Sequence, residues 1–147
     1  MKPLFFLLTV ALLATACRKT EPAPLAVPPV AKQITFDVFA GQDYSTTAAS
    51  PYGYKAASVK LMLKKSIKDG NQQDLWDTTF SYRPLVEYPM PPQQYQIIKT
   101  VTIAESKEQL DVSYEILYGS LYDAPQRFIK ASKLANGQNT LNLNVAL

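Results

Sequence analysis

The sequence has no histidine and only one cysteine among its 147 residues. Without histidine, neither a serine–histidine nor a cysteine–histidine catalytic pair can form, and the usual nitrogen ligands of a zinc site are missing. A lone cysteine cannot form a disulfide within the chain, so an exported domain of this sequence must be stabilised by its core. We therefore predict no metal, no cofactor and no enzymatic activity, with carboxylate chemistry as the remaining catalytic alternative.

Charge of one sign is not in excess, and long apolar runs are absent. The chain has 15 Lys and Arg residues and 12 Asp and Glu residues, which gives a formal net charge of +3. This balance does not indicate a nucleic-acid partner. The longest apolar run, residues 4–13, is too short to cross a bilayer, which needs about 20 apolar residues. We expect no retained transmembrane anchor.

The first residues, MKPLFFLLTVALLATAC, have the layout of a secretory signal. Lys2 supplies a positive start, residues 4–13 form the apolar region, and small residues follow at 14–16. We expect residues 1–16 to be a signal peptide that is removed after export.

The single cysteine follows those small residues directly. The stretch Leu13-Ala14-Thr15-Ala16-Cys17 resembles the lipobox of bacterial lipoproteins, although Ala14 stands where that family more often has Leu. The resemblance implies that the Cys17 thiol carries diacylglycerol and that the new amino group is acylated. Several acyl chains anchor a protein stably, whereas one chain does not. Arg18, in place of the Asp that retains such proteins at the inner membrane, implies the outer membrane and leaves the face open.

Residues 17–32 join the lipidated cysteine to the rest of the chain. They contain Pro22, Pro24, Pro28 and Pro29 among small and apolar residues. Such a composition favours an extended polyproline conformation, which acts as a semi-rigid spacer. We therefore expect a linker over 17–32 and one folded domain over 33–147, which is long enough for a single core.

Alternation of apolar and polar residues with a period of two dominates from residue 33 onward, and it predicts β-strands. The clearest strand places Leu110, Val112, Tyr114, Ile116 and Tyr118 on one face. The alternating segments are 34–38, 59–63, 76–82, 95–103, 110–118 and 141–147, with a seventh near 127–132.

The predicted fold class is all-β: a two-layer antiparallel β-sandwich of about seven strands, immunoglobulin-like or transthyretin-like. Turn residues such as Gly70 and Gly137 separate the strands, and the proline-rich stretch 84–92 reads as a crossing between sheets. Two segments also fit a helix. Residues 59–67 have apolar residues at helical spacing, and a short helix near 124–135 would have Pro125 in its first turn.

Lysines and loop tyrosines are the candidate binding residues. Lys60, Lys64, Lys65 and Lys68 form a basic group that would either protect a sheet edge or face anionic lipid or polysaccharide. Tyrosines outside the predicted strands give a large contact area at low entropic cost. They would either contact a ligand or pack their own loops on the sandwich. These tyrosines are Tyr44, Tyr52, Tyr54, Tyr88 and Tyr122.

These features together predict a lipid-anchored cell-envelope protein. It would act as a non-enzymatic binding or structural accessory module, attached to the membrane through Cys17, with an envelope protein or a polysaccharide as partner. The rival hypothesis is a hydrolase that acts on envelope or extracellular glycans. That rival requires two carboxyl groups about 5–10 Å apart in one cleft.

Overall fold

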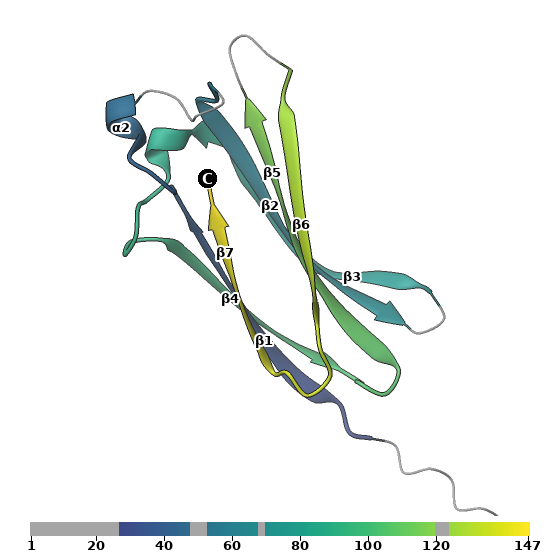
Figure 1. Cartoon of the computed structure of the whole chain (residues 1–147). Coiled ribbons are helices and arrows are strands. Elements are labelled where there is room, and N and C mark those ends of the chain that lie inside the picture. The colour runs from purple at the N-terminus through teal and green to yellow at the C-terminus, as the bar shows by residue number, and fades with distance from the viewer. Residues whose placement is uncertain (1–26, 48–52, 68–69, 120–123) are drawn as a thin grey trace, which may run out of the picture.

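The computed structural model describes residues 27–47, 53–67, 70–119 and 124–147, and in these ranges it is a sandwich of two β-sheets (Figure 1). The smaller sheet has the strand order β4-β1-β7 and the larger has β3-β2-β5-β6. The strands are β1 (Val30–Phe39), β2 (Ala56–Ile67), β3 (Gln72–Pro84), β4 (Tyr95–Ile103), β5 (Glu108–Gly119), β6 (Gln126–Leu134) and β7 (Thr140–Ala146). The predicted all-β sandwich is confirmed.

The connections within the described ranges hold little other regular structure. A single helical turn, α2 (Tyr44–Thr47), follows β1, and a short 3-10 turn, η1 (Leu85–Glu87), follows β3. No helix in the described ranges is long and apolar enough to cross a membrane.

The strand pairs are antiparallel except for one. β7 runs parallel to β1, with Gln33 opposite Thr140 and Phe39 opposite Ala146. Parallel neighbours need a long connection, and here every other strand lies between the two along the chain. β1 is thus the central strand of its sheet, between β4 and β7.

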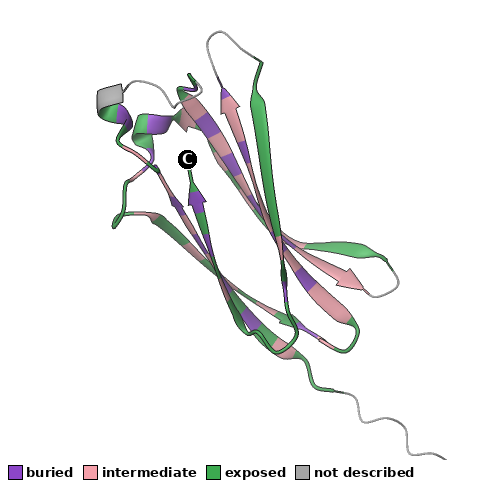
Figure 2. Cartoon of the chain, in the orientation of Figure 1, coloured by how far each residue is buried: buried purple, intermediate pink, exposed green. Residues whose placement is uncertain are grey.

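The period-two pattern identified the inward faces correctly. Leu110, Val112 and Ile116 are buried on β5, as expected for alternate residues of a strand that faces a core. Buried and less buried residues alternate along β2 and β7 in the same way (Figure 2). The core is completed from the smaller sheet by Ile34, Phe36, Val38, Leu143 and Val145.

Both helical alternatives are wrong. Residues 59–67 belong to β2, and the segment near 124–135 contains strand β6. β6 pairs with β5 without interruption from Leu134 opposite Leu110 to Gln126 opposite Tyr118. Pairing with a neighbouring strand satisfies the backbone and overrides the local capping pattern.

Strand β3 departs from the expected alternation because it contains two register shifts against β2. Ala57 lies opposite Arg83 whereas Val59 lies opposite Phe80, so Tyr82 does not share the inward face of Phe80. Tyr82 is exposed, and its hydroxyl lies over Gly119, where a Cβ atom would be 1.2 Å from it. A glycine at 119 therefore permits this close approach.

The basic group on β2 does not protect an edge, because β2 is an interior strand. Lys60 pairs with Asp77 at 3.0 Å, Lys64 with Asp74 at 3.1 Å, and Lys65 with Glu108 at 2.9 Å. Lys68 lies outside the described residues. Cross-strand ion pairs, rather than edge protection, account for the three described lysines.

Strand β1 begins three residues before the expected domain boundary at residue 33. Lys32, assigned from the sequence to the linker, is fully buried in β1. Its ammonium group donates to a Glu105 carboxylate oxygen, to the Gln138 carbonyl at 2.7 Å and to Asn139 Oδ1 at 3.1 Å. Hydrogen bonds from Lys32 and from the Gly137 N–H lower the pKa of Glu105. Such convergent partners are what a buried ammonium requires.

The two long sides of the sandwich differ. On one side β4 covers β3: the Tyr95 and Phe80 rings stack at 5.5 Å between centroids, and Lys99 lies 4.7 Å from the centre of the Trp76 ring. On the other side, β6 and β7 are joined at their lower ends and diverge toward the end of the chain marked C (Figure 1). The sandwich is therefore closed along β3 and β4, and it opens between β6 and β7.

Candidate binding cavity

The inner face of β6 is uncovered over half of its length. Phe128 and Lys130 lie opposite Ile116 and Tyr114 of β5, so they share the inward face with them. Leu134, at the closed end, is 1% exposed, whereas Phe128 is 47% exposed. An apolar side chain that points toward the core but remains half in water indicates that no element of the described ranges covers it.

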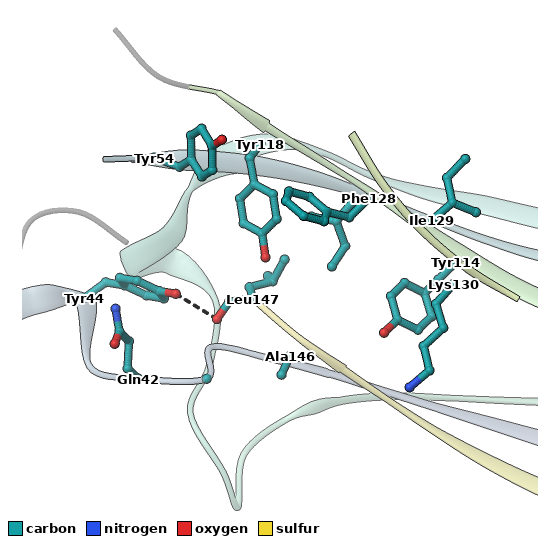
Figure 3. Close-up of a pocket in the computed structure, with 12 residues that line it drawn as sticks. Gln42, Tyr44, Tyr54, Tyr114, Tyr118, Phe128, Ile129, Lys130, Ala146 and Leu147 are labelled. Atoms are coloured by element: carbon teal, nitrogen blue, oxygen red, sulfur yellow. Dashed lines mark hydrogen bonds between the residues drawn. The ribbon is translucent and has the colours of Figure 1, made fainter. Parts of the chain in front are cut away.

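A cavity of about 610 Å³ lies beneath this face, between β5 and β6 on one side and the end of β7 on the other (Figure 3). This volume is within the range of sites that bind small molecules or side chains of a partner. The described lining residues are Gly41, Gln42, Tyr44, Tyr54, Tyr114, Ile116, Tyr118, Phe128, Ile129, Lys130, Ala146 and Leu147.

Aromatic rings form one wall of the cavity. Tyr118 stacks on Tyr54 with centroids 5.3 Å apart, and it meets the edge of Phe128 at 5.5 Å. Burial raises the pKa of Tyr118 to about 12 and also raises the pKa of Tyr114. Both phenols are therefore protonated at neutral pH, and each offers a hydrogen-bond donor as well as an apolar ring.

The opposite wall is fixed by hydrogen bonds to the main chain of Leu147. The Leu147 carbonyl accepts from the Tyr44 hydroxyl and from the Gly41 N–H, both at 2.8 Å, and the Leu147 N–H donates to the Phe39 carbonyl at 3.0 Å. Figure 3 shows the Tyr44 bond as a dashed line. These bonds fix the end of β7 to the end of β1 and to the segment that follows it.

Lys130 has the one charged side chain among the described residues that line the cavity. It is exposed, and none of the ion pairs between described residues involves it. In Figure 3 its ammonium group lies beside Tyr114 and away from the aromatic cluster of Tyr118 and Phe128. The described lining thus combines an apolar aromatic interior with one positively charged side chain.

The tyrosines proposed from the sequence have different positions. Tyr44 and Tyr54 are buried and line the cavity, so they both pack the loop and shape the candidate site. Tyr88 is a core residue away from it: its hydroxyl donates to the Ala57 carbonyl at 3.0 Å, and burial raises its pKa to about 12. Tyr52 and Tyr122 lie outside the described residues.

Ten of the twelve described lining residues were not identified as binding candidates from the sequence, among them the aromatic and charged residues Tyr114, Tyr118, Phe128 and Lys130. Tyr114 and Tyr118 have the same phase as the buried residues of β5, and this phase predicted core. Phe128 and Lys130 lie on the strand whose existence was uncertain. Their shared face, which alternates Gln126, Phe128, Lys130 and Ser132, mixes apolar and polar residues. That mixture was the one available indication of a face that is not simply core.

Carboxylate chemistry receives no support from this cavity, since none of its described lining residues is acidic. A second cavity, of about 540 Å³ at the other end of the sandwich, includes Glu105 and Glu108. Hydrogen bonds from the Ala104 N–H and from Lys65 lower the pKa of Glu108, and the pKa of Glu105 is lowered as well. A general acid requires a raised pKa. The described residues also contain no cluster of three side chains suited to a metal ion.

The cavity therefore suits binding better than catalysis: its walls are apolar and aromatic, and its one charge is at the margin. Comparison of this chain with models of known protein families, with curated proteins and with solved structures finds no match.

Proposed function

We propose that this protein is a lipid-anchored, non-enzymatic binding module of the outer membrane, and that its ligand occupies the cavity between β6 and β7. The observation that carries the proposal is the uncovered inner face of β6, with Phe128 47% exposed above a cavity of about 610 Å³. The ligand completes an apolar surface that the described residues leave open.

The closed side of the same sandwich supports a functional interpretation of the open side. There, β4 lies over β3, and Tyr95 covers Phe80. On that side an aromatic residue of one edge strand partly covers an aromatic residue of the other. Burial of an apolar side chain contributes about 1.5–3 kcal/mol. Because Phe128 is half exposed, the folded chain gains only part of this free energy of burial. A ligand that covers Phe128 gains the remainder when it binds.

The position of the cavity also fits a module anchored through Cys17. The linker enters at Val30, the first residue of β1, whereas the cavity lies beyond the last residue, Phe39. Ten strand residues span about 33 Å. Residues 18–29, if extended, add up to about 37 Å. The cavity therefore opens at the end of the domain farthest from the lipid, where partners in the envelope can reach it.

Accessibility of a cysteine in the cavity tests this proposal. Cys17 is the sole natural cysteine, and lipidation consumes its thiol, so a Phe128→Cys variant has one free thiol. A bound ligand at nine-tenths occupancy slows alkylation of that thiol by about tenfold. We expect this protection in intact envelopes and its loss after purification in detergent.

The matched control is Ile98→Cys on the outer face of β4, where the native side chain is 51% exposed. Its alkylation rate should be the same in envelopes and in detergent. Equal rates at position 128 under the two conditions would show that nothing occupies the cavity, and the proposal would fail.

A further inference from the structure

The two sheets differ by one strand, and the difference falls at the cavity. The smaller sheet ends at β7 and the larger continues to β6. At the other side of the sandwich the edge strands β4 and β3 face each other through Tyr95 and Phe80. One further strand beside β7 would cover β6 in the same way, directly over Phe128 and Lys130.

The free edge of β7 is the least protected of the four sheet edges in the described ranges. Natural edges carry charges, prolines, bulges or inward-pointing charged residues, which prevent pairing with other chains. β3 has two register shifts and ends in a proline, β4 has the inward Lys99, and β6 has Arg127, Lys130 and Lys133. β7, with the sequence TLNLNVA, has none of these, and its register against β1 is unbroken.

The main-chain groups of β7 that face this edge can be assigned. Both the N–H and the C=O of Leu147 bond toward β1, to Phe39 and Gly41. Successive residues of a strand direct these groups to opposite sides, so alternate residues of β7 direct theirs to the free edge. The Thr140 carbonyl, which accepts from the Gln138 side chain at 3.0 Å, agrees with this assignment. The residues that face the free edge are Thr140, Asn142, Asn144 and Ala146.

We propose that the cavity binds an extended segment of a partner protein, which adds to β7 as a fourth strand of the smaller sheet. This inference rests on the proposed binding function and names the class of ligand. Main-chain hydrogen bonds to β7 supply affinity, and alternate side chains that enter the cavity supply selectivity. A small apolar ligand would fill the cavity but would leave the β7 edge unpaired.

The cavity also defines which segment fits. Its wall from Tyr114 to Tyr118 is about 13 Å long, room for two or three inward side chains of an extended strand. Side chains beside Phe128 and Tyr118 must be apolar. The side chain nearest Lys130 must be acidic, because an exposed lysine beside an apolar site favours a carboxylate partner. The partner segment therefore alternates apolar and polar residues and places an Asp or Glu among the inward ones.

Two substitutions at one position test strand addition. Asn144→Pro removes an N–H that faces the free edge and leaves the bonds to β1 intact, which is the setting in which a strand tolerates proline. Asn144→Ala removes the side chain and keeps the N–H. The probes are synthetic peptides of about ten residues with alternating apolar residues and one glutamate. Peptides of the same composition with clustered apolar residues serve as controls. The protein is purified from its membranes in detergent.

We expect the alternating peptides to bind the natural protein and the Asn144→Ala variant alike. Asn144→Pro should weaken binding by about tenfold or more. Peptide binding should slow hydrogen exchange at Asn142, Asn144 and Ala146, and Lys130→Glu should reverse the preference from glutamate to lysine in the peptide. Equal binding by the two position-144 variants would overturn strand addition.

Three other outcomes would also overturn the proposal. If no peptide binds while Phe128→Cys is still protected in envelopes, strand addition fails and the binding function stands. If the Asn144→Pro change dissociates a dimer, a second copy occupies the edge. If the three β7 amides are already protected without peptide in the purified monomer, a segment of this chain occupies it.

Discussion

Replacing Phe36 with alanine should lower the free energy of unfolding by about 3–5 kcal/mol, the range for truncating a buried phenylalanine. Phe36 is fully buried on the central strand β1, and its ring lies 6.2 Å from that of Trp76 on β3. The substitution thus removes a contact between the two sheets and leaves a cavity where neighbouring strands cannot collapse. Urea denaturation followed by Trp76 fluorescence measures the loss.

Phe128→Ala is the matched control, because it makes the same chemical change on an inward face that is open. Its effect on the free energy of unfolding should be below about 1 kcal/mol, since Phe128 is already half in water. Affinity for the ligand, in contrast, should fall, while Tyr114, Tyr118 and Lys130 still contact it. If both variants destabilise the protein equally, the inner face of β6 is part of the core and the cavity is not a site.

Without the proposed lipid on Cys17, the protein should be found in the soluble fraction and not with the membranes. We propose that acyl chains on Cys17 are its anchor, since the apolar run of residues 4–13 is too short to cross a bilayer and belongs to the proposed signal peptide. Stable attachment needs more than one acyl chain. The variant for this test carries Cys17→Ser behind a secretory signal that is cleaved without lipidation, so that no apolar leader remains. We expect it in the soluble fraction, without label from a fatty-acid probe.

The natural chain, expressed in parallel, should stay with the membranes and take up the probe. Membrane attachment of the Cys17→Ser variant at the natural level would mean that the folded domain itself binds the envelope. Absence of label from the natural chain would contradict lipidation.

The sandwich could be predicted because each strand is covered on one face only. In such strands apolar and polar residues alternate along the sequence. Leu110, Val112 and Ile116 show this on β5. The parallel pairing of β7 with β1 could not be predicted, since alternation specifies a face and not a neighbour. The position of Tyr82 also depended on a register shift between β2 and β3. The alternation of apolar and polar residues over 76–82 does not indicate this register shift.

The cavity could not be predicted, because coverage of a face is a property of the tertiary structure. Tyr114 and Tyr118 have the phase of the core, and the sequence alone cannot show that no strand of the described ranges lies over them. Lys32 is the opposite case. A lysine at the end of a proline-rich stretch suggested linker, but Glu105, Gln138 and Asn139 converge on it from distant parts of the chain.

Photo-cross-linking in living cells tests the central claim most directly. A photoreactive phenylalanine analogue at position 128 places the reactive group in the cavity, and the same analogue at position 98 places it on the exposed outer face of β4. We predict a cross-linked adduct of discrete mass from position 128 and none from position 98. No adduct at position 128, or the same adducts from both positions, would contradict a ligand site between β6 and β7.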